Sequence, residues 1–243
     1  MKALILAAGY ATRLYPLTQN FPKPLLEIGG KSILDRLLED LDRISEIDQR
    51  IVVTNSTFAP IFRKGLVGRK DILIVDDGTT TNENRLGAVK DILFVLDSLH
   101  IEDDLLVLAG DNVVDFSFAP FIKFAVEKGR SCLTCHEEPS IPALQKTGVL
   151  EASEDMRVLA MHEKPQVPPS HWAVPPFYYY RAADLPLIRK ALDSGCGADA
   201  PGNLMAWLCK QTEVYAWPLP GKRYDIGDLA SYEFVNELYS SNK

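Results

Sequence analysis

The stretch LAAGYATRLYPLTQNFPKPLL, residues 6–26, continues a short apolar run, residues 3–6, that predicts a first β-strand. The loop that leaves this strand carries Gly9 and two cationic side chains, Arg13 and Lys23. Backbone amides in a glycine-containing turn can form an anion-binding concavity, arginine binds phosphate oxygens in pairs, and lysine acts as a mobile point charge. Prolines on both sides of Lys23 stiffen the backbone and would aim its amine. The loop is therefore predicted to bind a polyanion such as a nucleoside triphosphate (NTP).

The composition is that of a globular protein. The chain has 243 residues, of which 47% are hydrophobic and 24% are charged, which suits one α/β domain. Its net charge of −7 argues against general binding to nucleic acid or to anionic membranes. No apolar stretch approaches the roughly 20 residues of a membrane span, and no signal peptide is evident. We therefore expect a cytoplasmic protein with neither nucleic acid nor membrane as a partner.

The four cysteines, at positions 132, 135, 196 and 209, predict no cofactor site. The run Cys132-Leu-Thr-Cys135-His136 formally matches a haem attachment pattern, but no export signal accompanies it. The segment also resembles a strand, in which residues three apart point to opposite faces. No further ligands at zinc-site spacing are evident. We expect buried structural thiols.

Strand-like and helix-like runs alternate along the first half of the chain. Such alternation predicts a Rossmann-like, doubly wound, mixed and mainly parallel sheet with helices on both faces. Ser32 and Asp35 provide a capping box for the first helix. The predicted strands are residues 3–6, 51–53, 72–75 and 105–108, and the predicted helices are residues 33–44 and 88–99.

The second half is less regular, and no linker or repeat divides it from the first. We predict a single domain, with residues 1–130 as the nucleotide-binding half and residues 131–243 as the acceptor-binding half. The expected elements are a hairpin of residues 146–151 and 158–163, a strand at 173–180, and helices at 185–192, 203–209 and 228–239.

Asp111 is the middle residue of a Gly-Asp-Asn run that ends the apolar strand 105–108. Ligands of open α/β sheets bind beyond the carboxyl ends of the strands, where this carboxylate and the opening loop both lie. Mg²⁺ takes hard oxygen ligands and often needs only one or two protein carboxylates. Asp111 is therefore a candidate magnesium ligand.

Residues 7–26 resemble the opening signature of the sugar-1-phosphate nucleotidyltransferases, Gly-x-(Gly/Ala)-Thr-Arg-Leu-x-Pro-Leu-Thr followed by Pro-Lys-Pro-Leu. Ala11 departs from the glycine of many members, and alanine disfavours a positive φ. The resemblance implies the nucleotide-diphospho-sugar transferase fold, with Arg13 and Lys23 as catalytic residues. It also implies nucleotide contacts from Leu6, Ala7, Ala8, Gly9, Tyr10, Ala11, Thr12 and Asp111.

The resemblance also implies a second magnesium ligand late in the chain. The run Tyr224-Asp225-Ile226-Gly227 is similar to a late Asp-x-Gly element of the family, which assigns Asp225 together with Asp111 to Mg²⁺. Asp228 is a competing candidate, although its position suits a helix cap.

The acceptor-binding residues are expected mainly in the second half. Glu163-Lys164-Pro165 resembles the acceptor motif of the family, in which the carboxylate accepts hydrogen bonds from sugar hydroxyls and the lysine neutralises the acceptor phosphate. Gly148 resembles the glycine whose backbone lies against the sugar. We also assign Asn112 to acceptor binding.

Two segments depart from the family pattern. Residues 77–88 lack the usual glutamine of base recognition; Gly87 would allow close approach of the nucleotide, and Asn82 or Asn84 could read a pyrimidine edge. Residues 172–180 contain Pro175 and Pro176 in place of the usual Thr-Gly, which weakens an assignment of glucose 1-phosphate as the acceptor.

The resemblance implies a Mg²⁺-dependent enzyme that joins an NTP, preferably a pyrimidine NTP, to a sugar 1-phosphate and releases pyrophosphate. A phosphomonoester has a second pKa near 6, so the acceptor needs no general base, and we regard His136 and His162 as bystanders. Two alternatives stay open: a cytidylyltransferase acting on a non-sugar phosphate such as phosphocholine, and a catalytically silent nucleotide-sugar sensor. A dinucleotide-binding oxidoreductase fits less well, because its glycine fingerprint is absent.

The resemblance further leads us to expect no additional acyltransferase or regulatory domain after the last helix. The sequence is compatible with a homo-oligomer but does not define one.

Overall fold

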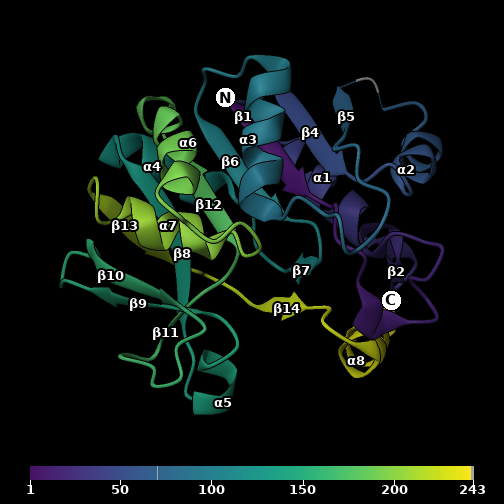
Figure 1. Ribbon diagram of the computed structural model, residues 1–243. Coiled ribbons are helices and arrows are strands. Elements are labelled where there is room, and N and C mark those ends of the chain that lie inside the picture. Colours follow the sequence, from purple (N-terminus) through teal and green to yellow (C-terminus); the bar gives the residue numbers. More distant parts are fainter. Residues whose placement is uncertain (70, 242–243) are drawn as a thin grey trace. The chain divides into compact units, whose positions relative to one another are not determined.

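A computed structural model describes residues 1–69 and 71–241 (Figure 1). The chain forms two compact units, each assembled from separate segments. Unit 1 comprises Met1–Arg85, Ala109–Phe118 and the segment from Gly221 onward, and unit 2 comprises Leu86–Leu108 and Ala119–Pro220. The single domain with halves at residues 1–130 and 131–243 stays a prediction.

Unit 1 contains a parallel sheet in which β1 pairs with β4 and β4 pairs with β5. The strands are β1 (Lys2–Leu6), β4 (Gln49–Thr54) and β5 (Ile72–Asp76). Ala3, Leu4 and Ile5 are fully buried, as expected for a strand covered on both faces. The apolar runs at residues 3–6, 51–53 and 72–75 therefore predicted these strands correctly.

The first helix, α1 (Ile33–Leu41), begins as the sequence predicts. The Ser32 hydroxyl accepts a hydrogen bond from the Asp35 backbone amide at 3.0 Å and donates one to the Asp35 carboxylate at 2.7 Å. The apolar face of α1, from Ile33 to Leu41, is buried. Capping and amphipathic spacing together place this helix against the core.

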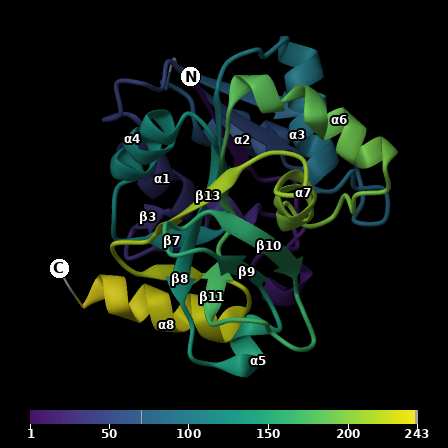
Figure 2. The ribbon, with the colours of Figure 1, turned by 90° about the vertical axis from the view of Figure 1, so that its left-hand side faces the viewer.

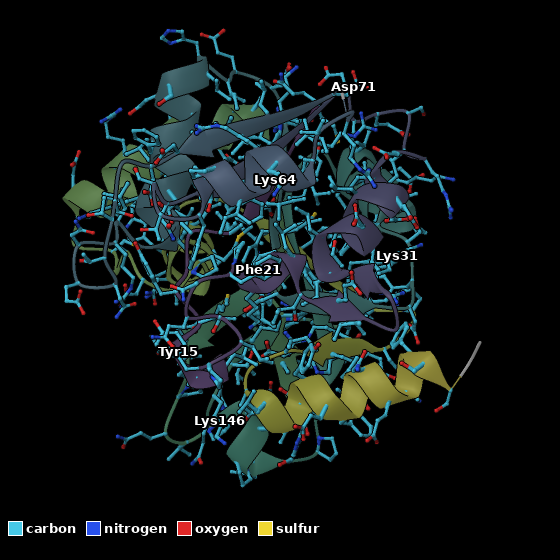
Figure 3. All side chains as sticks on the ribbon, turned by 90° about the vertical axis from the view of Figure 1, so that its right-hand side faces the viewer. Tyr15, Phe21, Lys31, Lys64, Asp71 and Lys146 are labelled. Atoms are coloured by element: carbon cyan, nitrogen blue, oxygen red, sulfur yellow. The ribbon has the colours of Figure 1, made fainter. Side chains whose placement is uncertain are left out.

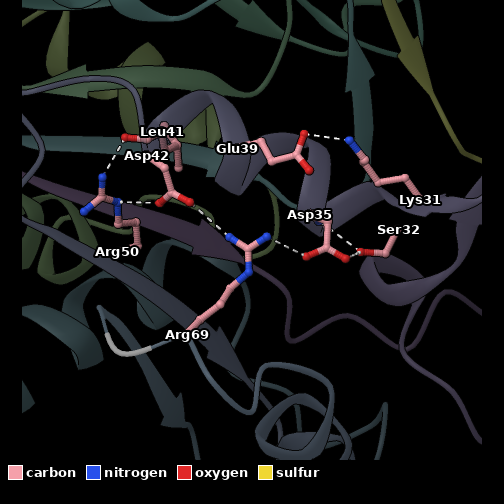
Figure 4. A network of polar contacts seen from close by, with 8 residues as sticks. All are labelled: Lys31, Ser32, Asp35, Glu39, Leu41, Asp42, Arg50 and Arg69. Atoms are coloured by element: carbon pink, nitrogen blue, oxygen red, sulfur yellow. Dashed lines mark hydrogen bonds and ion pairs between the residues drawn. The ribbon is translucent and has the colours of Figure 1, made fainter.

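Charged residues tie the outer side of α1 to the sheet (Figure 4). Arg69 forms ion pairs with Asp35 at 3.0 Å and with Asp42 at 3.1 Å. Arg50, on β4, donates a hydrogen bond to the Leu41 carbonyl at 2.8 Å and so satisfies a backbone group at the end of the helix.

The remaining elements of unit 1 are short, except for α8. Strand β7 pairs antiparallel with β14, and this ladder aligns Asn112 with Asp225. These elements are η1 (Thr12–Leu14), η2 (Lys23–Leu25), β2 (Glu27–Ile28), β3 (Lys31–Ser32), α2 (Ala59–Gly65), β7 (Asn112–Val114), β14 (Arg223–Asp225) and α8 (Leu229–Ser240).

Unit 2 contains a mixed sheet with strand order β10-β9-β11-β8-β12-β6 (Figure 1). Strand β13 pairs parallel with β8, whereas the other pairs within this unit are antiparallel. Its strands are β6 (Leu105–Ala109), β8 (Ser131–Glu137), β9 (Gly148–Ala152), β10 (Val158–Glu163), β11 (Trp172–Val174), β12 (Phe177–Tyr180) and β13 (Val214–Pro218).

The strand predicted at residues 173–180 is divided in the structure. Strands β11 and β12 are separated by Pro175 and Pro176. Both pair with β8, but β11 has β9 as its other neighbour, whereas β12 has β6. Proline has no backbone N–H and cannot donate to a ladder, which explains the break. The predicted hairpin of β9 and β10 is confirmed.

Three helices of unit 2, α3, α6 and α7, begin and end close to the residues predicted for them, whereas α4 and α5 were not predicted. Helix α3 is entered through Gly87, as expected. The helices are α3 (Ala88–Leu99), α4 (Ala119–Lys128), α5 (Ile141–Leu144), η3 (Ala182–Asp184), α6 (Pro186–Asp193) and α7 (Gly202–Leu208). None of the helices within the described ranges has the length and apolar character needed to cross a bilayer.

The cysteines behave as structural thiols. Cys132 and Cys135 are buried and free on β8, and burial raises the pKa of each thiol to about 12. Cys196 and Cys209 are also free and partly buried. Such thiols stay protonated at neutral pH and are poor metal ligands or nucleophiles.

Candidate functional site

The loop after β1 presents unused backbone donors. Within the described part of the chain, the amides of residues 8–13 donate no hydrogen bond. The carbonyls of Ala7 and Ala8 instead accept hydrogen bonds from Thr54 Oγ1 at 3.1 Å and Asn55 Nδ2 at 2.9 Å, which fixes the loop to the end of β4. Anchored carbonyls with open amides are the arrangement expected of an anion-binding loop.

Individual residues of this loop differ in exposure. Gly9, Thr12 and Arg13 are exposed, whereas Tyr10 is buried and its ring lies 5.6 Å from that of Phe58. The backbone amide of Ala7 is used inside the sheet, where it donates to Val53. The open amides and the exposed cation are therefore the part of residues 6–13 that can meet a ligand.

Ala11 adopts the left-handed conformation, with φ 46° and ψ 44°. Its carbonyl accepts hydrogen bonds from the Leu14 amide at 2.9 Å and from Thr18 Oγ1 at 2.8 Å. The loop therefore keeps the backbone that glycine would adopt freely, at the conformational cost of an alanine side chain.

Lys23 is held between two buried prolines and points at a carboxylate. The residue is 6% exposed, and its Nζ lies 2.9 Å from Asp111 Oδ2. The preceding loop leaves Tyr15 and Phe21 exposed (Figure 3). The expectation that the Pro-Lys-Pro sequence aims the amine is consistent with this geometry.

Asp111 is fixed by the residues on either side of it. Gly110 packs closely against the end of β1, since a Cβ atom there would lie 3.0 Å from the Leu6 carbonyl oxygen. Asn112 is 1% exposed, and its Nδ2 donates to Asp111 Oδ1 at 2.7 Å. Both observations explain why a glycine and an amide flank this carboxylate.

The pairing of β7 with β14 brings the second predicted carboxylate to the same place. The Ile226 amide donates to the Asp111 carbonyl at 3.1 Å, and Arg223 Nη1 donates to Asn112 Oδ1 at 2.9 Å. Gly227 lies beside both Asp225 and Arg13: a Cβ atom there would be 3.8 Å from Asp225 Oδ2 and 3.9 Å from the Arg13 guanidinium nitrogens. We call the resulting group the charged cluster; its members are Arg13, Lys23, Asp111, Arg223 and Asp225.

Sequence reasoning missed Arg223. Its distance along the chain from Asn112 hides the contact, which depends on the register of β7 and β14. A signal was nevertheless available: Arg223 lies two residues before Asp225, and residues two apart in a strand share one face.

The two carboxylates of the charged cluster have opposite pKa shifts. Burial alone would raise the pKa of Asp111, but the Lys23 ammonium and Arg223 outweigh burial and hold this pKa below its usual value. Burial raises the pKa of Asp225, and the neighbouring Asp111 carboxylate raises it further against the opposing effect of Arg223, Lys23 and Arg13. The neighbouring cations therefore do not fully compensate the negative charge of Asp225.

This donor set fits a magnesium ion. No group of three or more His, Cys, Asp or Glu side chains suited to a metal exists among the described residues, but Mg²⁺ bound with phosphates commonly uses only one or two carboxylates. Asp225 accepts no hydrogen bond from any described donor and repels Asp111. A divalent cation would relieve this repulsion. Asp228, the competing candidate, instead caps α8 by accepting from the Ser231 amide at 2.9 Å.

The residues predicted to bind the acceptor, other than Asn112, lie in unit 2. Glu163 is aligned with Gly148 in the β9–β10 ladder, and Lys164 follows with a φ of 49°. The Lys164 Nζ lies 3.9 Å from Glu163 Oε1, and the two side chains are 58% and 18% exposed. Burial raises the pKa of Glu163, and Lys164 opposes this shift.

The residues predicted for base recognition have local structural roles. Asn84 Oδ1 accepts from the amides of Thr80 and Thr81, and the Asn82 carbonyl accepts from Arg85 at 2.8 Å. Gly87 has φ 88°, and a Cβ atom there would lie 2.7 Å from the Ala198 carbonyl oxygen. The fold itself thus requires glycine at position 87, and nucleotide contacts of Asn82 and Gly87 stay predictions.

Comparisons with known proteins identify the family of this chain. The family model described as nucleotidyl transferase matches residues 2–242. The chain is 26% identical to glucose-1-phosphate adenylyltransferase of Fervidobacterium nodosum, over 96% of this chain and 60% of that protein. It is 30% identical to the mannose-1-phosphate guanylyltransferase catalytic subunit beta of Drosophila pseudoobscura pseudoobscura, over 99% of this chain and 63% of that protein.

The fold is shared with solved structures. The crystal structure of a UDP-glucose pyrophosphorylase complexed with UDP-glucose is similar with a TM-score of 0.83 at 18% identity, covering 100% of this chain and 99% of that chain. The predicted Rossmann-like fold class is thereby confirmed, with the parallel pairs of unit 1 and the mixed sheet of unit 2.

The chain spans about 60% of the length of the two curated relatives described above. The match nevertheless runs through the opening loop, the Gly-Asp-Asn turn and the late Asp-x-Gly element. The resemblance predicted from residues 7–26 is confirmed, and the chain belongs to the nucleotidyl transferase family.

Proposed function

We propose that this protein is a Mg²⁺-dependent enzyme that transfers a nucleotidyl group from an NTP to a sugar 1-phosphate, giving an NDP-sugar and pyrophosphate. The observation that carries the proposal is the charged cluster, in which three cations and two carboxylates adjoin a loop with open amides. The named relatives act on glucose 1-phosphate and mannose 1-phosphate, which supports a sugar phosphate as the acceptor.

The chemistry requires two anions to react with each other. An oxygen of the acceptor phosphate attacks the α-phosphorus, the bond to the β-phosphate oxygen breaks, and pyrophosphate leaves. The acceptor is already largely ionised at neutral pH, since its second pKa is about 6. No side chain has to remove a proton, and catalysis rests on positioning and charge stabilisation.

The protein supplies the positive charge from unit 1. Arg13 is exposed and can bind the β- and γ-phosphates through its planar fork, and the open loop amides can bind phosphate oxygens. The flanking prolines restrict the backbone of Lys23, and its amine can exchange Asp111 for a phosphate oxygen. Mg²⁺ held by Asp111 and Asp225 would offset the remaining negative charge.

The acceptor is assigned to residues of unit 2, with Glu163 accepting hydrogen bonds from sugar hydroxyls and Lys164 facing the acceptor phosphate. The largely buried carboxylate beside an exposed ammonium supports these two roles. Asn112 stays a predicted acceptor residue, although its amide oxygen already accepts from Arg223 and its amide nitrogen donates to Asp111.

A pyrophosphate-release screen tests the proposal. Each of the four NTPs and thymidine triphosphate would be combined with glucose 1-phosphate, mannose 1-phosphate, N-acetylglucosamine 1-phosphate and phosphocholine, with Mg²⁺ or with a chelator. Release that requires a sugar 1-phosphate and Mg²⁺ is expected. Release only with phosphocholine and CTP would favour the cytidylyltransferase, and binding of an NDP-sugar without any turnover would favour the silent sensor.

The same screen addresses the base. The sequence favours a pyrimidine NTP, whereas the names of the relatives include adenylyl- and guanylyltransferases, so the preference stays a prediction. The cytoplasmic location and the oligomeric state also stay predictions.

A further inference from the structure

Glu163 has two glycines beside its carboxylate, both in unit 2. Gly148 lies opposite it on β9, and a Cβ atom there would be 3.3 Å from Glu163 Oε2. Gly202 is the first residue of α7, which packs on β10 (Figure 2). A Cβ atom on Gly202 would overlap Glu163 Oε2 and would lie 3.0 Å from Met161 Cε. The carboxylate therefore occupies the space that a side chain at position 202 would fill.

The backbone at position 202 does not explain this glycine. Gly202 is absent from the residues with positive φ in the described chain. It is the first residue of a helix, and glycine has a lower helix propensity than alanine, by up to about 1 kcal/mol at interior positions. The overlap with Glu163 is the feature of its surroundings that excludes a larger residue.

The carboxylate itself is short of partners. No donor in the described chain forms a hydrogen bond with Glu163, and its nearest cation, Lys164, is 3.9 Å away. A carboxylate that is only 18% exposed normally accepts several hydrogen bonds. Its position is thus set by packing against Gly202 and Gly148, and its acceptor capacity is left for a ligand that carries hydroxyl donors.

We propose that Gly202 is a positioning residue of the acceptor site: by having no side chain, it leaves the slot that holds the Glu163 carboxylate in place for vicinal hydroxyls of the acceptor sugar. This inference rests on the acceptor role of Glu163 in the proposed function. It predicts that a single methyl group at position 202 displaces the carboxylate, because the overlapping atom is the free end of a flexible side chain.

The test is a double-mutant cycle of Gly202→Ala and Glu163→Ala, with the KM values for the sugar 1-phosphate and for the NTP as readouts. Gly202→Ala should raise the KM for the sugar 1-phosphate about tenfold or more, leave the KM for the NTP within twofold, and change the melting temperature little. In the Glu163→Ala background, where no carboxylate remains to be displaced, the same substitution should have no further effect on either KM.

Gly197→Ala is the matched control. A Cβ atom at Gly197 would lie 2.6 Å from the Asn203 amide nitrogen, again the end of a flexible side chain near the start of α7, but it does not approach Glu163. This variant should keep the wild-type KM for the sugar 1-phosphate. An equal rise in Gly197→Ala would show a general disturbance of α7 and overturn the inference.

Two further results separate failure of the inference from failure of the proposed function. A raised KM in Glu163→Ala together with an unchanged KM in Gly202→Ala, or an additive loss in the double variant, would overturn the positioning role and leave the acceptor role of Glu163 intact. An unchanged KM in Glu163→Ala would refute the acceptor role, and the inference with it. If Gly202→Ala is unstable, a normal melting temperature of the double variant still locates the conflict at Glu163.

Discussion

At the residue scale, the account depends on charges that the fold brings together from three parts of the chain. Lys23 and Asp111 form a close ion pair, and Asp225 lies near both without a hydrogen-bond partner in the described chain. The cluster has one more cation than carboxylates before any ligand binds, and adjoining backbone amides are open. We expect such a site to attract a polyphosphate and to exchange the internal ion pair for phosphate contacts.

Replacing Lys23 by alanine should lower kcat about 100- to 1,000-fold, the usual loss when one preorganised electrostatic contact to the transition state is removed. Steady-state pyrophosphate release measures this effect. Lys31→Ala is a suitable control, since Lys31 pairs with Glu39 on α1 and should leave kcat unchanged. A folded Lys23→Ala enzyme with near-normal turnover would refute the catalytic role.

Replacing Asp225 by asparagine should abolish the stabilisation of the protein by Mg²⁺. The wild-type melting temperature is expected to rise when Mg²⁺ replaces a chelator, because the ion binds the folded state and relieves the repulsion between Asp111 and Asp225. Asp48→Asn, at a surface ion pair with Lys2, should retain the full shift. A wild-type melting temperature that does not respond to Mg²⁺, or an unchanged shift in Asp225→Asn, would contradict the metal assignment.

Ala11→Gly should stabilise the protein by about 0.5–1 kcal/mol. Glycine adopts the left-handed backbone without the steric cost of a Cβ atom, but its greater freedom in the unfolded chain offsets part of that gain. Urea unfolding measures the change in the free energy of unfolding. Ala230→Gly, in the helical backbone of α8, should instead destabilise the protein. A loss of stability in Ala11→Gly would show that the left-handed conformation carries no strain.

At the element scale, the predicted site residues of unit 1 lie at or just beyond the ends of strands, and helix α8 begins soon after the last of them. Strand β1 leads into the open loop, β6 leads into Asp111, and β14 places Asp225 beside it by pairing with β7. Helix α8 then begins directly after the cluster, with Asp228 and Ser231 forming its capping box. The charged side chains thus lie at strand ends and in the loops that follow them.

Ser32→Ala should cost about 1 kcal/mol of folding stability, the usual loss for an N-cap side chain. The Ser32 hydroxyl satisfies the Asp35 amide, and alanine would leave that amide without its acceptor. Melting curves or urea unfolding would show the loss. Ser32→Gly should lose only a few tenths of a kcal/mol, because glycine is an acceptable N-cap; equal losses in the two variants would contradict the capping role.

The sequence predicted those strands and helices that a local pattern of residues defines by itself. Buried parallel strands such as residues 51–53 are continuous apolar runs, and α1 combines a cap with an amphipathic stripe. The break at Pro175 and Pro176 was missed, although proline chemistry explains it. The contact of Arg223 with Asn112, and the close approach of the Glu163 carboxylate to Gly202, could not be predicted because each depends on pairing or packing between distant segments.

At the scale of the whole molecule, the two units divide the predicted tasks. The charged cluster belongs entirely to unit 1, whereas Gly148, Glu163 and Lys164 belong to unit 2. Of the charged cluster, the opening signature predicted Arg13 and Lys23, and two later motifs predicted Asp111 and Asp225. The segments at residues 77–88 and 172–180 differ from the family pattern, and they are where we expect the choice of base and acceptor to be made.

The central claim is that the charged cluster transfers a nucleotidyl group to a sugar 1-phosphate. Its most direct measurement is mass-spectrometric identification of the product formed by the purified protein from an NTP, a sugar 1-phosphate and Mg²⁺. The account predicts an NDP-sugar and pyrophosphate in equal amounts, with both lost in the presence of a chelator. Absence of an NDP-sugar with every NTP and every sugar 1-phosphate, from a folded protein that binds NTP, would contradict it.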